Sequence, residues 1–137
     1  MDRLLIAAAL VVVAVGVALV LRRRRPDPPT QPRWSVPAQL DRHDFSRPEA
    51  AWLVAVFTSS TCGSCGELVD KAAALASEAV EVQEVEFLAC RELHERYGID
   101  AVPTVVMADH EGVVRGSFVG PVSAADLWAK VAEVRED

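Results

Sequence analysis

The chain has 137 residues, 51% of them hydrophobic and 25% charged, and its net charge is −6. This length accommodates one globular domain and little more. Because the chain is acidic and only 6% of its residues are aromatic, the composition argues against a nucleic-acid-binding protein, and no nucleic-acid partner is expected.

The N-terminal 25 residues differ from the rest in hydropathy and charge. Residues 4–21 are hydrophobic except for Gly16, and none is charged. As a helix they would span about 27 Å, the lower end of what a bilayer core requires. A cleaved signal peptide is the alternative, but it would have a shorter apolar core and a small-residue cleavage site. This run ends in Leu21 and four arginines, so we predict a retained transmembrane anchor over residues 1–25, embedded through residues 4–21.

The charges beside this run predict its orientation. Arg22–Arg25 follow the apolar residues, whereas Arg3 alone precedes them. Since basic residues next to a span stay on the cytoplasmic side, we expect a single-pass protein of the cell membrane whose C-terminal domain is cytoplasmic.

Prolines dominate the segment after the arginines. Proline fixes φ and lacks the amide donor, so such a segment favours extended, semi-rigid structure. We predict a spacer over residues 26–37 and a folded domain over residues 38–137. The prolines of the spacer are Pro26, Pro28, Pro29, Pro32 and Pro37.

The domain alternates between strand and helix patterns. Trp52 to Phe57 is a continuous apolar run, typical of a strand that is covered on both faces. The order β-α-β-α-β-β-α predicts an α/β fold with a central mixed four-stranded sheet flanked by helices. The elements that follow the first strand are expected as a helix over 63–78, a strand over 80–87 with an irregularity midway, a helix over 90–97, a strand over 103–109, a turn over 110–112, a strand over 113–119, and a last helix capped by Ser123 with Asp126.

A Cys-x-x-Cys pair stands where the first strand passes into a helix. The free amides and dipole of a helix N-terminus stabilise a thiolate, which is the species that attacks disulfides. Cys62 takes the place of the exposed nucleophile, and Cys65 that of the thiol that resolves the mixed disulfide. We therefore predict that these two residues are catalytic and form a redox disulfide. Gly63 would leave room for a substrate backbone, and the Ser64 side chain can bond nearby amides.

Other uses of the two cysteines are weighed against this prediction. Structural zinc needs four ligands, and the remaining candidates are scattered singly, so no metal site is expected. A purely structural disulfide is disfavoured on the cytoplasmic side, and two buried, inert thiols stay an alternative. The scattered zinc candidates are Cys90, His43, His94 and His110.

Taken together, these features resemble the thioredoxin superfamily over about residues 40–135. The segment Tyr97-Gly98-Ile99-Asp100-Ala101-Val102-Pro103-Thr104 is similar to the stretch in which that family keeps a cis-proline facing the cysteine pair, and Gly112 and Gly120 fall where the family has glycines. The resemblance implies a thioredoxin-like fold in which Pro103 is cis and shapes a groove beside Cys62. It also implies that the backbone of Val102 pairs with an extended substrate segment.

The chain departs from the family pattern near the cysteines. Thr61 and Ser64 replace the usual tryptophan and proline, and Val56 stands where typical members have a buried aspartate that assists proton transfer. Glu84 or a neighbour replaces the usual partner lysine. The proton of Cys65 therefore needs another acceptor, for which water and Glu86 are candidates.

Several polar and aromatic residues are expected to matter less. Cys90 is interpreted as a partly buried, reduced thiol, with a regulatory thiol as the alternative. His94 is expected to be solvated, and Trp52 and Trp128 to belong to the core. The acid-rich set is expected to be a solvated face, and it comprises Glu81, Glu84, Glu86, Glu92 and Glu95.

The sequence thus predicts a membrane-tethered thiol–disulfide oxidoreductase that reduces or exchanges disulfides of a protein or small-molecule substrate, with no organic cofactor. An electron donor, which the sequence does not name, is also required. Two alternatives are kept open. One is a non-enzymatic adaptor that binds a partner at the groove near Pro103, and the other is an outward-facing oxidoreductase that acts in the maturation of exported proteins.

Overall fold

The computed structural model describes residues 1–23 and 34–137. The helix α1 (Asp2–Arg23) and the residues from Trp34 to Asp137 form two separate units. The predicted spacer over residues 26–37 lies largely outside the described residues, so the spacer and the domain boundaries beside it stay predictions.

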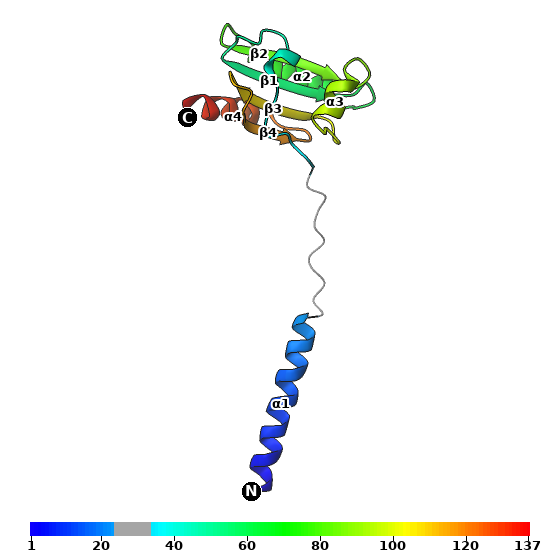
Figure 1. Cartoon of the computed structure of the whole chain (residues 1–137), viewed down its shortest axis with the longest axis vertical. Coiled ribbons are helices and arrows are strands. Elements are labelled where there is room, and N and C mark those ends of the chain that lie inside the picture. Colours follow the sequence, from blue (N-terminus) through cyan, green and yellow to red (C-terminus); the bar gives the residue numbers. More distant parts are fainter. Residues whose placement is uncertain (24–33) are drawn as a thin grey trace. The chain divides into compact units, whose positions relative to one another are not determined.

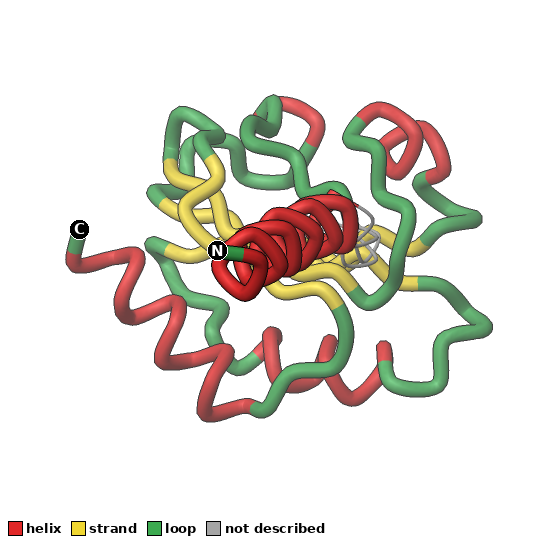
Figure 2. Tube along the Cα trace, turned by 90° about the horizontal axis from the view of Figure 1, so that it is seen from below, coloured by secondary structure: helices red, strands yellow, loops and turns green. Residues whose placement is uncertain are grey.

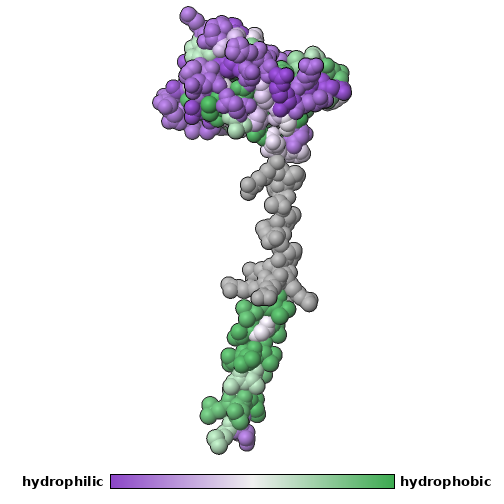
Figure 3. Space-filling view, in the orientation of Figure 1, coloured by the Kyte–Doolittle hydropathy of each residue, from purple (hydrophilic) through white to green (hydrophobic). Residues whose placement is uncertain are grey.

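Helix α1 has 22 residues and would therefore be about 33 Å long. Its segment Asp2–Val20 is long and apolar enough to cross a membrane, and none of that segment is buried within the chain. Beyond its first residues, the helix has a predominantly apolar surface over residues 4–20 (Figure 3). The structure thus contains the apolar helix that the sequence predicted.

The domain is built on a four-stranded sheet in the order β2-β1-β3-β4 (Figure 1). Strand β1 pairs in parallel with β2 and antiparallel with β3, which pairs antiparallel with β4. This is the predicted mixed sheet, and the α/β class is confirmed. The elements are η1 (Arg42–Asp44), β1 (Trp52–Thr58), α2 (Cys65–Ala73), β2 (Val80–Glu86), α3 (Arg91–Arg96), β3 (Thr104–Asp109), β4 (Val114–Val119) and α4 (Ala124–Glu136).

Both faces of the sheet are covered, as the continuous apolar run of β1 predicts. On one face, Val54 and Val56 pack against buried residues of α2 and α4. On the other face, Leu53 and Phe57 pack against Leu40 and the segment around α3. Helices accordingly lie on both sides of the strands (Figure 2).

Helix α2 is shorter than the predicted helix over 63–78. It begins at Cys65 and ends at Ala73, and the chain then forms a turn. The Ser77 amide donates to the Val80 carbonyl (3.0 Å), and the Ser77 hydroxyl accepts from the Val80 amide (3.2 Å). These bonds lead the chain into β2, so the helix-favouring composition of residues 74–78 is overridden.

Strand β2 has no irregularity, contrary to the prediction. Its register with β1 is continuous from Val80 to Glu86. Val80 and Val82 face α2, whereas Val85 faces the core on the other side of the sheet. The apolar residues therefore pass from even to odd positions because they serve opposite faces of a regular strand. The register shift in the sheet lies instead between Met107 and Ala108 of β3.

Helix α4 begins as predicted, but one tryptophan is placed differently. The Ser123 hydroxyl accepts from the Asp126 amide (3.1 Å) and donates to its carboxylate (2.8 Å). Trp128 is 45% exposed and is not a core residue. The Trp128 ring N–H donates to the Lys71 carbonyl (3.0 Å). This bond holds the ring against α2 and not in the core between the helices and the sheet.

Candidate active site

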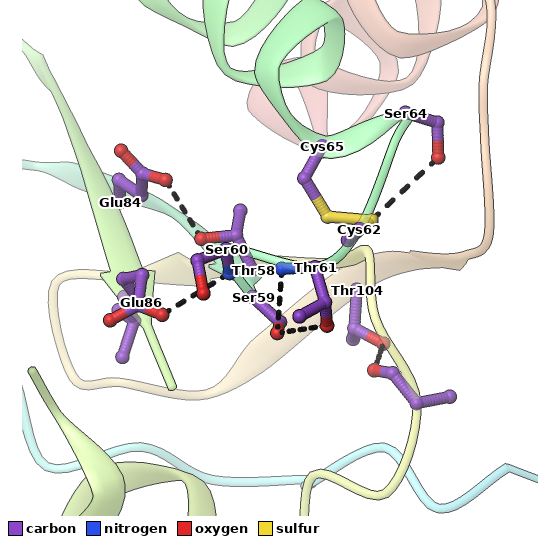
Figure 4. Close-up of a disulfide and its surroundings, with 12 residues drawn as sticks. Thr58, Ser59, Ser60, Thr61, Cys62, Ser64, Cys65, Glu84, Glu86 and Thr104 are labelled. Atoms are coloured by element: carbon purple, nitrogen blue, oxygen red, sulfur yellow. Dashed lines mark hydrogen bonds between the residues drawn. A yellow bond between two sulfur atoms is a disulfide. The ribbon is translucent and has the colours of Figure 1, made fainter. Parts of the chain in front are cut away.

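The cysteine pair lies at the edge of the sheet where β1 ends. Residues 59–64 lead from β1 into α2, whose first residue is Cys65. Phe57 of β1 is opposite Thr104 of β3, so Pro103 lies at this same edge. The close-up shows the disulfide with Thr104 nearby (Figure 4). The fold therefore brings together the predicted cysteines and the predicted groove proline from segments far apart in the chain.

Cys62 and Cys65 form a disulfide with an S–S distance of 2.17 Å and a Cα–Cα distance of 5.5 Å. The two residues differ in burial. Cys65 is 3% exposed, whereas Cys62 is half-buried. An incoming substrate can therefore reach the Cys62 sulfur more readily than the Cys65 sulfur.

Backbone hydrogen bonds fold the turn that carries the pair. The Cys62 amide donates to the Ser59 carbonyl (3.1 Å), and the Cys65 amide donates to the Cys62 carbonyl (3.4 Å). The Ser64 side chain makes no capping bond to the amides of α2, contrary to the expectation. Its hydroxyl lies 3.8 Å from the Cys62 sulfur (Figure 4). Ser64 therefore contacts the sulfur and leaves the helix amides without a side-chain cap.

Gly63 is exposed between the two cysteines. A Cβ built on Gly63 would meet nothing within 4 Å. The surface beside the disulfide is consequently open at Gly63. This is consistent with the prediction that Gly63 leaves room for a substrate backbone.

The Val102–Pro103 peptide bond is cis, as the resemblance implies. Pro103 is buried, and its carbonyl accepts from the Gly120 amide (2.8 Å). Val102 is half-buried, and within residues 1–23 and 34–137 its amide and carbonyl make no hydrogen bond. The backbone of Val102 is thus available for the predicted pairing with a substrate segment.

A side-chain hydrogen bond joins Thr58, the last residue of β1, to Glu84 of β2. The Thr58 hydroxyl donates to the Glu84 carboxylate (2.8 Å). Thr58 is 1% exposed, and Glu84 is exposed to solvent. The sequence pointed to Glu84 alone, as the residue in place of the usual partner lysine, and no local pattern pairs it with Thr58 of the neighbouring strand.

Glu86, a candidate proton acceptor from the sequence, is engaged in backbone contacts. Its carboxylate accepts from the Ala89 amide (2.9 Å) and the Ser60 amide (3.3 Å). Hydrogen bonds from the amides of Ala89 and Leu88 hold the pKa of Glu86 below its usual value. The lowered pKa makes this carboxylate a weak base, and its contacts join the loop before Cys62 to the turn after β2.

The acid-rich set is not the purely solvated face that was expected. Glu84 and Glu86 make the contacts described above. The Glu81 carboxylate lies 3.2 Å from the Arg47 guanidinium and accepts from the Ser46 hydroxyl (2.9 Å). These bonds fasten the Ser46–Arg47 turn to β2.

His94 is buried, contrary to the prediction that it is solvated. It is 2% exposed, and its Nε2 lies 2.8 Å from the Val85 carbonyl oxygen. Its ring packs edge-on against Phe57 and Phe87. The sequence did contain a signal for this burial. His94 lies four residues after Cys90, which was expected to be partly buried, and residues four apart share one face of a helix.

The remaining zinc candidates do not converge. Cys90 is a free, half-buried thiol that packs against the core beside α3. Among the residues that the structure describes, no group of three or more histidine, cysteine, aspartate and glutamate side chains is arranged to hold a metal ion.

Comparisons with known proteins agree with this geometry. A family model described as Thioredoxin matches residues 40–133. The chain is 34% identical over 86 residues to a probable thioredoxin of Methanothermobacter thermautotrophicus, a match that covers 61% of this chain and 95% of that protein. It is 32% identical over 83 residues to a probable thioredoxin of Methanothermobacter marburgensis, covering 58% of this chain and 92% of that protein.

Solved structures show the same fold. The germline-specific thioredoxin Deadhead of Drosophila melanogaster superimposes with a TM-score of 0.55 at 26% identity, covering 63% of this chain and 83% of that one. Mitochondrial thioredoxin 3 of Saccharomyces cerevisiae superimposes with a TM-score of 0.54 at 19% identity, covering 63% of this chain and 81% of that one. The chain therefore belongs to the thioredoxin family and is a thiol–disulfide oxidoreductase.

Proposed function

We propose that this protein is a membrane-tethered thiol–disulfide oxidoreductase in which Cys62 attacks disulfides of substrates and Cys65 releases the product. The observation that carries the proposal is the unequal burial of the two bonded cysteines at the start of α2. Cys62 is half-buried, whereas Cys65 is 3% exposed. A reachable first sulfur and a protected second sulfur suit the order of steps in thiol–disulfide exchange.

The reduced pair would act in two steps. The Cys62 thiolate attacks one sulfur of the substrate disulfide, expels one substrate thiolate and forms a mixed disulfide. The Cys65 thiolate then attacks the Cys62 sulfur, which forms the Cys62–Cys65 bond and expels the second substrate thiolate. Two electrons pass from the pair to the substrate, and a separate dithiol donor has to reduce the pair again.

The surroundings of the pair support a role in holding an extended substrate. Gly63 is open to solvent, and the Ser64 hydroxyl lies 3.8 Å from the attacking sulfur. The backbone of Val102, next to the buried Pro103, makes no hydrogen bond within the described residues. A substrate strand that pairs with Val102 would present its disulfide to Cys62.

The membrane location and its orientation rest on the N-terminal segment. Asp2–Val20 is long and apolar enough to cross a membrane. Four arginines follow residue 21 and only Arg3 precedes it, so the positive-inside rule favours a cytoplasmic domain. We accordingly propose that the domain reduces or exchanges disulfides at the cytoplasmic face of the cell membrane.

A reductase assay on the full chain in detergent micelles tests the chemistry. With dithiothreitol as electron donor, the wild-type protein should reduce a disulfide-bonded model protein. Cys62→Ser should abolish this activity, and Cys65→Ser should accumulate a mixed disulfide at Cys62. Cys90→Ser serves as the matched control and should retain activity. Undiminished activity of Cys62→Ser would refute the assignment of the nucleophile.

Two further measurements separate the alternatives. Protease added to intact cells should leave the C-terminal domain untouched if the domain is cytoplasmic. Digestion of the domain would instead place it outside the cytoplasm, as an outward-facing oxidoreductase requires. Complementation of a deletion strain by the Cys62→Ser/Cys65→Ser double variant would favour the adaptor.

A further inference from the structure

Most of the large hydrophobic side chains that stay exposed in the domain lie at the edge of the sheet that carries the disulfide. Phe87 and Leu88 directly follow β2, and Val119 ends β4 opposite Thr104. These three residues lie at the strand ends that meet the loop of the cysteine pair. Among the described residues of the domain, the exposed large hydrophobic side chains are those of Trp34, Phe87, Leu88, Val119 and Trp128.

Leu88 has the most exposed side chain of this set. It is 67% exposed and belongs to neither core cluster of the described residues. Because single exposed apolar residues are common on protein surfaces, exposure alone carries no argument. Leu88, however, also borders an open hollow of about 550 Å³ that Ala89 and Leu93 line as well. An apolar side chain beside a hollow is the arrangement in which a partner's side chain can be anchored.

The turn that carries Leu88 is fastened to the loop before Cys62. The Glu86 carboxylate accepts from the Ala89 amide (2.9 Å) on one side and from the Ser60 amide (3.3 Å) on the other. Neighbouring strands lie about 4.8 Å apart, so the turn after β2 lies next to the loop after β1. A polypeptide bound at Cys62 can therefore reach Leu88, and the fixed turn needs no ordering to receive it.

The loop that contains the disulfide offers no large apolar side chain of its own. Thr61 stands immediately before Cys62, and Gly63 and Ser64 separate the two cysteines. An apolar contact with a substrate beside this loop has to come from another segment. Leu88 supplies one from the turn after β2.

Charges around Leu88 indicate which neighbours a bound apolar side chain should have. Glu84 and Glu92 are exposed, and Glu86 is half-buried. The guanidinium of Arg91 lies over the Phe87 ring, 5.1 Å from its centroid. Three carboxylates against one guanidinium favour basic groups in a bound segment and oppose acidic ones. A second copy of this acidic chain would bring like charges together, so a basic polypeptide is the better occupant.

We propose that Leu88 and the adjoining hollow form a docking site for an apolar side chain of the substrate polypeptide, close in sequence to the attacked half-cystine and accompanied by lysine or arginine. The inference rests on the proposed function and names its substrate class. Leu88 is a specificity-determining residue in this scheme and takes no part in the exchange of disulfides.

A single-turnover experiment on the reduced full chain in detergent micelles tests the inference. The probes are short peptides whose cysteine is joined by a disulfide to 2-nitro-5-thiobenzoate. Attack on the peptide sulfur by Cys62 expels the thiobenzoate, which is the better leaving group and is followed by its absorbance. One peptide has leucine and lysine within three residues of the cysteine, a second has serine in place of leucine, and a third has glutamate in place of lysine.

The wild-type protein should react with the leucine peptide about ten times faster than with the serine peptide, in keeping with the burial of one leucine side chain. Leu88→Ser should remove this preference, and Leu88→Met, which keeps an apolar side chain, should retain it. The glutamate peptide should react more slowly than the lysine peptide at low ionic strength, and this difference should vanish near about 0.5 M salt.

A small disulfide without peptide side chains, 5,5′-dithiobis(2-nitrobenzoate), should react at the same rate with wild type and both Leu88 variants. A preference for leucine that persists in Leu88→Ser, or a Leu88→Ser protein that is slowed equally with every probe, would overturn the inference. Sedimentation that finds a dimer of wild type and a monomer of Leu88→Ser would assign the site to a second copy instead. A wild-type protein that reacts with none of the probes would refute the proposed function itself.

Discussion

The Ser64 hydroxyl lies 3.8 Å from the Cys62 sulfur, although Ser64 occupies the N-cap position of α2. In the reduced protein the hydroxyl can donate to the Cys62 thiolate and stabilise it. Removing such a bond costs about 1 kcal/mol, which corresponds to roughly a fivefold change in an equilibrium.

Ser64→Ala should therefore lower the fraction of Cys62 thiolate at neutral pH. We expect the rate of Cys62 alkylation by iodoacetamide at pH 7 to fall about fivefold, in line with the loss of one hydrogen bond to the thiolate. Ser64→Thr keeps the hydroxyl and should react at the wild-type rate. Equal rates for wild type and Ser64→Ala would show that the hydroxyl does not stabilise the thiolate.

Gly112→Ala should strongly destabilise the domain. A Cβ at Gly112 would meet the Leu40 carbonyl oxygen at 2.0 Å, and the φ of 82° at this residue disfavours any side chain. The Gly112 carbonyl also accepts from the Leu40 amide (2.8 Å), so displacement of the turn would break this bond. We expect the free energy of unfolding, measured with urea and tryptophan fluorescence, to fall by about 2–4 kcal/mol.

Gly66 provides the matched control for that substitution. It lies in α2, and a Cβ there would meet nothing within 4 Å. Gly66→Ala should raise the free energy of unfolding by about 0.5–1 kcal/mol, because alanine favours the helix. A loss of stability in Gly66→Ala similar to that of Gly112→Ala would contradict the steric explanation.

His94→Ala should weaken the packing between α3 and the sheet. The substitution removes a 2% exposed ring that contacts Phe57 and Phe87, and it leaves the Val85 carbonyl without its imidazole partner. We expect a loss of about 2–4 kcal/mol in the free energy of unfolding. His43→Ala, which truncates a side chain that is 87% exposed, should leave stability unchanged in the same urea titration.

Asp44 should make stability depend on pH in the acid range. The Tyr97 hydroxyl and the Arg96 guanidinium hold the pKa of Asp44 below its usual value. The unfolded carboxyl binds a proton at higher pH than the folded one. The stabilisation by Asp44 is therefore fully present above the unfolded pKa of about 3.9 and is lost as the pH falls through the folded value.

Asp44→Asn tests this dependence. It should destabilise the protein at pH 7 by about 1–3 kcal/mol, and the difference from wild type should diminish below pH 4. Urea titrations at several pH values between 2.5 and 7 measure it, with Asp100→Asn as an exposed control. A stability difference between Asp44→Asn and wild type that is constant over this range would contradict the linkage.

The local patterns in the sequence account for much of the fold. The apolar run of β1 required cover on both faces, and Leu53 and Val54 are indeed buried on opposite sides of the sheet. The cysteine spacing at a strand–helix junction predicted the pair that the structure joins in a disulfide. These predictions succeeded because periodicity and turn residues act over a few neighbouring positions.

The predictions that failed involve residues whose structure depends on the strand beside them. Residues 74–78 have a helix-favouring composition, but hydrogen bonds between Ser77 and Val80 lead the chain into the edge strand. His94 was expected to be solvated, but its Nε2 meets the Val85 carbonyl and Phe57 covers its ring. No local pattern specifies such contacts.

The sequence by itself determined the α/β class, the apolar N-terminal helix and the place of the cysteine pair, since each depends on composition and short-range spacing. Only the tertiary structure decided that Cys65 is buried while Cys62 is not, and that the Thr58 hydroxyl meets Glu84, 26 residues further along the chain. The reason is that burial and pairing depend on non-local contacts: the parallel register of β1 with β2, for example, brings Thr58 and Glu84 together.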